Sequence, residues 1–195
     1  MGRPSVQKQR KAEVLDAFMT LVARFGVEGA TLERIAEESG LKRPLIRHHL
    51  GNRDEMVRAL ALHVVEEQRI SLENLRTALQ DYPGLMNFVD ALFSEDSETD
   101  TRLNNAYQAL VMVVEQYPDL RQILTGVMAE FYALARQIVQ KEYPSADPED
   151  VQTVAHGVVD LYLTADALSP LNPPPDWRRS AYLGAVKLAQ SLGSP

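Results

Sequence analysis

Apolar side chains recur every three or four residues along nearly the whole chain, which is the spacing of helices that bury one face. The first stretch with this repeat contains Val14, Phe18, Leu21, Val22 and Phe25. No window alternates apolar and polar residues beside a hairpin signal, and the dipeptides Asn-Gly and Asp-Gly are absent. The pattern therefore predicts an all-α protein.

Glycine, proline and capping residues divide this pattern into about nine helices. Three short helices form a head, and a long fourth helix from Asn52 to Leu79 joins the head to a body. The body is expected to hold five more helices, over residues 85–92, 103–117, 120–143, 151–169 and 177–192. We therefore predict two domains, residues 1–53 and residues 54–195.

Charge is distributed unevenly between these two parts. The chain has 20 Lys and Arg against 27 Asp and Glu, a net charge of −7, yet the head alone holds ten basic and six acidic residues. Because phosphates are neutralised locally, a basic head on an acidic body is expected of a protein that contacts DNA at one end. Chance clustering is the alternative. The absence of cysteine excludes disulfides, thiolate metal sites and cysteine nucleophiles.

The sequence offers no segment suited to a membrane. Its longest stretch without a charged residue, residues 103–114, is far shorter than the run of about 20 apolar residues that a spanning helix needs. The basic N-terminus is not followed by the apolar core of a secretory signal. We therefore expect a cytoplasmic protein without a membrane partner.

The segment TLERIAEESGLKRPLIRHHL, which begins at Thr31, combines two short helices and a turn. Thr31 can cap the first helix, and Gly40 can adopt the left-handed conformation that ends it. Ala36 is small enough for a steep helix crossing, and Ile46, with Leu45 beside it, can pack back against the first helix. This spacing is typical of a helix-turn-helix.

If the second helix turns its aliphatic face inward, its outward positions are Lys42, Arg43, Pro44, Arg47 and His48. Three of these five side chains are permanently cationic, and arginine can donate two hydrogen bonds to a guanine edge or hold a phosphate. A solvated charged face is the plainer interpretation. The coincidence of the cations with the helix-turn-helix spacing favours DNA binding.

The order of these features resembles the N-terminal domain of TetR-family regulators over roughly residues 7–60. The matching elements are a first helix that ends near Gly26, then T-x-x-x-I-A-x-x-x-G, then L-x-x-x-x-I-x-x-H and G-N-R-D-E-M at the start of a long helix. The resemblance implies a homodimeric transcriptional regulator, usually a repressor, that binds a palindromic operator in double-stranded DNA. It also implies that a small, largely apolar effector binds the C-terminal helices and releases the DNA.

The resemblance assigns roles to individual residues of the head. Thr31 would cap a helix and give its hydroxyl to a phosphate, while Arg47 and Arg53 would contact the DNA backbone. Arg47 and Leu50 stand where the family commonly has Tyr and Phe, which changes the expected contact pattern. His49 is expected to pack inward. Base edges would be read by Lys42, Arg43, Leu45 and His48. The N-terminal tail would add a DNA contact or only solubility through Arg3, Lys8, Arg10 and Lys11.

The body shows no catalytic signature: it has no glycine-rich phosphate loop, no G-x-S-x-G and no H-E-x-x-H. We therefore expect no enzyme, no cofactor and no metal. His156 and Asp160, one helical turn apart, could share a ligand group or simply form a helical hydrogen bond. The polar and aromatic candidates for binding an effector are Tyr107, Gln108, Met112, Glu115, Tyr132, His156, Asp160, Tyr162 and Trp177.

The last two expected helices resemble the pair that forms the dimer interface in the family. Helical spacing alone does not separate such an interface from a core. Two other classes of protein stay open: a helix-turn-helix-like module for protein contacts without ligand control, and a small all-helical enzyme. The candidates for the dimer interface are Val154, Val158, Leu161, Leu183 and Val186.

Overall fold

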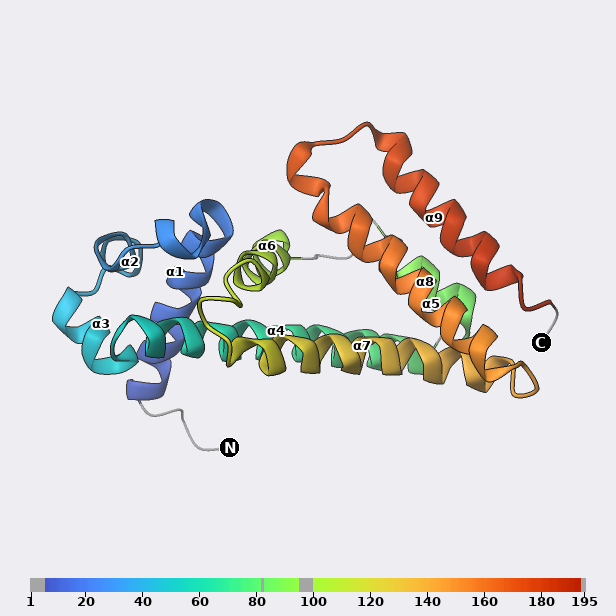
Figure 1. The fold of residues 1–195 in the computed structure, drawn as a ribbon, viewed down its shortest axis with the longest axis horizontal. Helices are drawn as coiled ribbons and strands as arrows, with labels where there is room; N and C mark the ends of the chain where they lie inside the picture. Colours follow the sequence, from blue (N-terminus) through green and yellow to red (C-terminus); the bar gives the residue numbers. More distant parts are fainter. Residues whose placement is uncertain (1–5, 82, 95–99, 194–195) are drawn as a thin grey trace. The chain divides into compact units, whose positions relative to one another are not determined.

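The computed structural model describes residues 6–81, 83–94 and 100–193, and within these ranges the chain forms nine α-helices and no strand (Figure 1). The all-α prediction is confirmed. No helix in these ranges combines the length and apolarity needed to cross a membrane. The helices are α1 (Val6–Gly29), α2 (Leu32–Ser39), α3 (Arg43–Leu50), α4 (Arg53–Asp81), α5 (Leu85–Phe93), α6 (Thr101–Val111), α7 (Leu120–Glu142), α8 (Pro148–Ala167) and α9 (Pro175–Gln190), with a 3-10 turn η1 (Ser169–Leu171).

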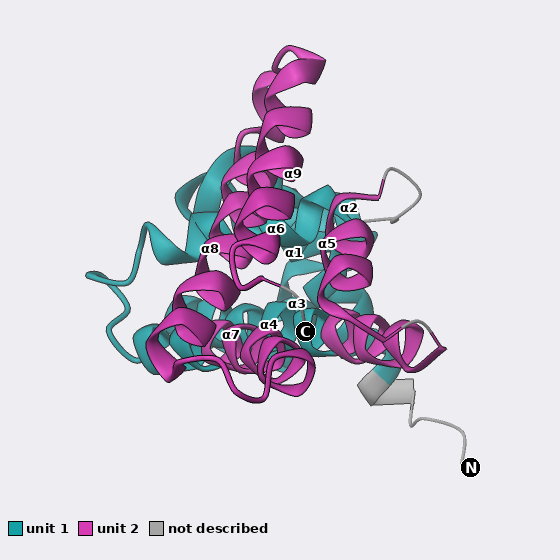
Figure 2. Ribbon diagram, turned by 90° about the vertical axis from the view of Figure 1, so that its right-hand side faces the viewer, with its two compact units in different colours: residues 1–69, 100–126 teal, residues 70–99, 127–195 magenta. Residues whose placement is uncertain are grey.

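The chain folds into two compact units, which Figure 2 shows in different colours. Unit 1 comprises residues 1–69 and 100–126, and unit 2 comprises residues 70–99 and 127–195. Unit 1 is discontinuous in sequence because α6 packs against α1. The expected bounds, 1–53 and 54–195, do not coincide with these units, and as functional bounds they stay a prediction.

The helix caps of unit 1 follow from local sequence. The Thr31 hydroxyl oxygen accepts a hydrogen bond from the backbone N–H of Arg34 at 3.4 Å, and Gly40 ends α2 at φ 67°. The Asn52 side-chain oxygen accepts from the Glu55 N–H at 3.0 Å, and the Glu55 carboxylate accepts from the Asn52 N–H at 2.7 Å. This reciprocal pair is a capping box at the start of α4.

The core of unit 1 lies where α1 meets α2, α3 and α6. Phe18 and Val22 of α1, Ile35 of α2 and Ile46 of α3 are all fully buried there. Gly26 interrupts α1 as expected, since its φ of 71° is not helical, but the helix resumes beyond it as far as Gly29.

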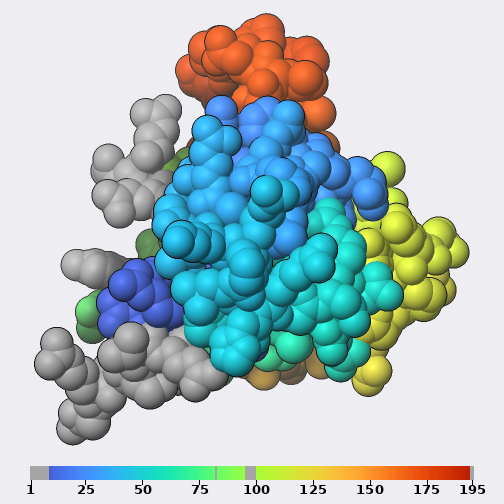
Figure 3. Space-filling model, turned by 90° about the vertical axis from the view of Figure 1, so that its left-hand side faces the viewer, coloured from blue at the N-terminus to red at the C-terminus, as the bar shows by residue number. Residues whose placement is uncertain are grey.

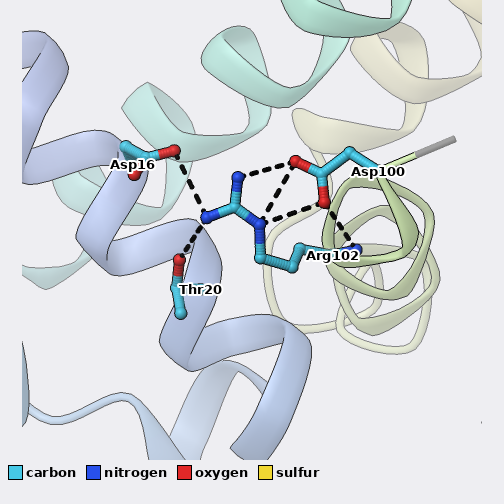
Figure 4. A network of polar contacts seen from close by, with 4 residues as sticks. All are labelled: Asp16, Thr20, Asp100 and Arg102. Carbon is cyan, nitrogen blue, oxygen red and sulfur yellow. Dashed lines mark hydrogen bonds and ion pairs between the residues drawn. The ribbon is translucent and has the colours of Figure 1, made fainter. Parts of the chain in front are cut away.

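A polar network also joins α6 to α1 (Figure 4). Arg102 Nη1 donates to Thr20 Oγ1 at 3.0 Å and lies 3.7 Å from Asp16 Oδ1. Arg102 Nη2 lies 2.7 Å from Asp100 Oδ2, and this hydrogen bond holds the pKa of the Asp100 carboxyl below its usual value. Arg102 therefore connects the start of α6 to the middle of α1.

Unit 2 contains a series of five aromatic rings in contact, of which the three phenylalanines are buried and the two tyrosines half-buried. Edge-to-face contacts join Phe88 to Phe131, Phe131 to Tyr162, Tyr162 to Phe93, and Phe93 to Tyr182, with ring centroids 5.8–6.5 Å apart. This is the preferred geometry of packed aromatic side chains. The rings come from α5, α7, α8 and α9, so these four helices share one core.

One expected helix is shorter than the sequence pattern predicts. Residues 103–117 were expected to be helical throughout, but α6 ends at Val111. Beyond it several N–H groups bond to the third preceding carbonyl, as in Val113 to Leu110 at 3.2 Å and Gln116 to Val113 at 3.0 Å. Several β-branched residues here lose side-chain freedom in a helix, which favours these tighter turns.

Proline lies in the first turn of three helices. Pro44 is the second residue of α3, where its missing N–H costs little. The sequence pattern predicts that the last two helices begin at Val151 and Trp177. These starts are wrong, because Pro148 and Pro175 begin α8 and α9.

Candidate DNA-binding surface

Helices α2 and α3 lie side by side on one face of unit 1, seen in light blue to cyan in Figure 3. Ile35 and Ile46, both 0% exposed, hold the two helices against α1. The prediction for Ile46 is confirmed, whereas the expected inward packing of Leu45 is wrong. Successive helical residues differ in direction by about 100°, so burial of Ile46 leaves Leu45 39% exposed on the outward face.

The outward face of α3 presents a series of basic side chains. Lys42, Arg43, Arg47 and His48 are all exposed. His49 is half-buried, and its ring centroid lies 5.5 Å from that of His48. The face therefore presents three permanent cations to solvent.

One of these cations has an acidic partner. Arg43 Nη1 donates to Glu33 Oε1 of α2 at 2.7 Å. The pKa of Glu33 is lowered, first by a hydrogen bond from its own backbone N–H and next by the Arg43 side chain. This carboxylate therefore stays ionised at neutral pH.

Arg53 makes intramolecular contacts that the sequence did not indicate. Its Nη1 donates to the Ala30 carbonyl at 3.0 Å, its Nη2 donates to the Val27 carbonyl, and its guanidinium lies 5.4 Å from the ring centroid of Phe18. The partners are 23 and 26 residues away in sequence, beyond the reach of any local pattern. Arg53 thus ties the start of α4 to the end of α1, and its phosphate contact stays a prediction.

A surface hollow of about 470 Å³ lies where α3 meets α4. Its walls include Arg47, Arg53 and Asn52 of the capping box that starts α4. Arginine suits an anion, but the Arg53 guanidinium already donates to two carbonyls of the chain and the Asn52 N–H to the Glu55 carboxylate. A phosphate contact in this hollow stays a prediction. Its lining residues are Leu32, Arg47, Gly51, Asn52, Arg53 and Met56.

Two further exposed arginines of unit 1, on α1 and α2, were not indicated by the sequence pattern. Arg24 and Arg34 place their guanidinium groups 5.0 and 4.6 Å from the ring centroid of Phe25. Phe25 was expected on the buried face of α1, which is wrong, because it is 46% exposed. The ring lies at the kink of α1, where the helical repeat no longer predicts direction.

The basic residues before this surface are described only in part. Arg10 and Lys11 are exposed on α1, and Arg10 Nη1 lies 2.8 Å from Glu13 Oε2. The expected contacts of Arg3 and of the Lys8 side chain fall outside the described residues.

Four effector candidates lie on or just after α6. The Tyr107 hydroxyl donates to the Leu124 carbonyl at 3.1 Å, and burial raises the pKa of Tyr107 to about 12. Gln108 is exposed, Met112 is 82% exposed, and Glu115 forms an exposed ion pair with Arg121 at 2.8 Å. Of these four, only Tyr107 contributes to the interior of unit 1.

Three effector candidates come together in unit 2. The rings of Tyr132 and His156 stack with centroids 4.2 Å apart, and the Tyr132 hydroxyl donates to Asp160 Oδ1 at 2.5 Å. A tyrosine from α7 thus contacts both members of the α8 pair. Tyr162 packs into the aromatic core, while Trp177 is 52% exposed.

The dimer candidates divide into two groups. Val154 and Val158 are buried in the core of unit 2, so they have little surface left for a second chain. Leu161 and Val186 are half-buried, and Leu183 is 44% exposed. A prediction of a dimer interface therefore depends on these last three.

These features define a helix-turn-helix DNA-binding domain in unit 1. Residues 14–60 match the family model described as "Bacterial regulatory proteins, tetR family". The N-terminal part of the chain is therefore a DNA-binding domain of the TetR type.

Comparisons with whole proteins agree with this assignment. Over 124 residues the chain is 22% identical to the HTH-type transcriptional regulator BetI of Burkholderia mallei, a stretch that covers 63% of this chain and 64% of that relative. The fold is similar to a TetR-family regulator from Cytophaga hutchinsonii, with TM-score 0.80, 13% identity and 98% of each chain covered. It is also similar to FadR from Bacillus subtilis in complex with stearoyl-CoA, with TM-score 0.60, 11% identity, and 91% of this chain and 96% of that chain covered.

Proposed function

We propose that this regulator binds an inverted-repeat operator as a homodimer in the cytoplasm and releases it when a small, largely apolar effector binds. The observation that carries the proposal is the outward face of α3, where Lys42, Arg43 and Arg47 are exposed above the buried Ile46. Arginine and lysine on such a helix can reach base edges and phosphates in a major groove. Thr31, Leu45, His48 and Arg53 complete the proposed contact set.

Selection of duplexes from a random library by the purified protein tests the DNA-binding part. We expect an inverted repeat with half-sites about one helical turn apart, because a twofold dimer presents its two recognition helices to successive major grooves. Arg47→Ala should weaken binding to all duplexes and reduce the salt dependence, since Arg47 is proposed to hold a phosphate. Equal, weak binding to every duplex would refute the proposal.

The homodimer is supported by the apolar side chains that α8 and α9 leave accessible, Leu161, Leu183 and Val186. Light scattering should give twice the chain mass of 21.8 kDa. Leu183→Lys should shift the mass toward that of one chain and weaken operator binding, because it places a charge on the proposed interface. A single-chain mass with and without operator DNA would contradict the dimer.

Effector control is supported by the fold shared with FadR, which was solved with an acyl thioester, and by the clustered Tyr132, His156 and Asp160. An effector that favours the DNA-free form by about 1–3 kcal/mol would lower operator affinity roughly 5- to 150-fold. The test is a thermal-shift screen of stearoyl-CoA and apolar drugs, followed by titration of each hit into the protein–operator complex. Tight binders that leave operator affinity unchanged would refute the switch.

A further inference from the structure

The ion pair between Glu33 and Arg43 bridges the two helices of the helix-turn-helix on their exposed side. Arg43 is the first residue of α3, Glu33 lies in the first turn of α2, and their side chains are 59% and 63% exposed. Water screens so open a pair, so it adds little to folding stability. The buried Ile35 and Ile46 already hold the helices together. The pair therefore contributes little to holding the two helices together.

The carboxylate changes what Arg43 can bind. A guanidinium beside a carboxylate carries almost no net local charge, so its attraction for a phosphate is weak. Its hydrogen-bond donors remain, since the bond to Glu33 uses one of the five N–H groups of arginine. A guanine edge offers the neutral acceptors O6 and N7 and requires correctly directed donors rather than net charge.

The pair also restricts Arg43 before any DNA is bound. A free arginine side chain loses considerable rotamer freedom when it is fixed in a groove, and prior orientation reduces that loss. The Glu33 carboxylate is charged at neutral pH and accepts the Arg43 Nη1 hydrogen bond at 2.7 Å, so it limits the directions that the guanidinium can take.

We propose that Glu33 is a positioning residue that directs the Arg43 guanidinium toward a guanine in the operator and disfavours its use on phosphates, an inference that rests on the proposed DNA binding. Specificity at one base pair then depends on an acidic residue of α2 as well as on a basic residue of α3. Of the two arginines that α3 exposes, Arg43 acts in sequence reading, while Arg47 supplies electrostatic attraction.

The matched control for this proposal is Glu37, which is exposed one turn later on the same helix. Glu33→Gln and Glu37→Gln remove the same charge, but only the first removes the partner of Arg43. The experiment selects operator duplexes with the wild-type protein. It then measures affinity for the best duplex and for duplexes with single G·C replacements, using wild type, both Gln variants, Arg43→Ala and Arg43→Ala combined with Glu33→Gln. Thermal unfolding confirms that each variant is folded.

We expect Arg43→Ala to abolish discrimination at one G·C pair. Glu33→Gln should reduce discrimination at that same pair by about 1.4- to 5-fold, the range for loss of an exposed ion pair. It should have no further effect in the Arg43→Ala background, and Glu37→Gln should leave discrimination unchanged.

Three results would overturn the proposal. If both Gln variants strengthen binding to all duplexes equally, Glu33 only repels DNA. If Glu33→Gln alters preference at a different base pair from Arg43→Ala, Glu33 reads a base itself. If Glu33→Gln leaves discrimination intact, the pair has no role in reading. Failure of the wild type to select any sequence is a separate outcome, because it refutes the proposed function together with this inference.

Discussion

Replacement of Arg53 by methionine distinguishes a structural from a DNA-contacting role for this residue. The guanidinium donates to the Val27 and Ala30 carbonyls, and a buried hydrogen bond from a charged donor contributes about 1.5–3 kcal/mol. Arg53 is half-buried, and water weakens its hydrogen bonds. We therefore expect the two bonds together to contribute about 2 kcal/mol to the free energy of unfolding. In a chain of this size that loss lowers Tm by roughly 4–8 °C.

Thermal unfolding followed by circular dichroism measures this loss, and Arg58→Met is its control. Arg58 lies on the same helix, but its ion pair with Asp119 is exposed, with side-chain exposures of 56% and 48%. We expect that variant to lose less than about 1 kcal/mol. If Arg53→Met unfolds like Arg58→Met and only its operator affinity falls, the internal hydrogen bonds contribute nothing and Arg53 serves the DNA backbone.

Three further predictions concern unit 1. Ile46→Ala should lower the unfolding free energy by about 2–5 kcal/mol in urea titrations, since Ile46 is fully buried; a loss below 1 kcal/mol would contradict its core role. Asp100→Asn should destabilise the protein at neutral pH, because Arg102 lowers the carboxyl pKa in the folded state. Urea unfolding at several pH values should show the difference from wild type shrinking as pH falls below 3.8, and a constant difference would refute this. Ultraviolet titration should detect a phenol that ionises near pH 12, absent in Tyr107→Phe. Because burial favours the neutral phenol of Tyr107, the stability that this neutral group contributes to the fold is lost as pH rises from 10 through 12. A titration curve that is the same in wild type and Tyr107→Phe would argue against this burial.

Features determined by neighbouring residues could be predicted from the sequence. Thr31, Gly40 and Asn52 cap or end helices through bonds that reach at most three residues, so a short window contains both partners. Burial of Ile46 follows from helical spacing alone. The same logic fails at Val111, because apolar residues three or four apart fit both a continued helix and the tighter turns that follow it.

Features determined by distant residues could not be predicted. The internal use of Arg53 depends on carbonyls at the end of α1, and the partner of Arg43 lies ten residues earlier on another helix. Spacing identified both arginines as exposed cations of the candidate site, but not what their guanidinium groups contact. Charge pairing across a fold depends on three-dimensional distance, which a one-dimensional pattern does not contain.

The discontinuity of unit 1 has a consequence for building hybrid regulators. A chimera that takes residues 1–69 from this protein and every later residue from another would leave behind α6, which packs against α1. It would also leave Asp16 and Thr20 without the guanidinium of Arg102. A transplantable DNA-binding module must therefore carry residues 100–126 as well, so three crossovers are needed where a linear reading of the chain suggests one.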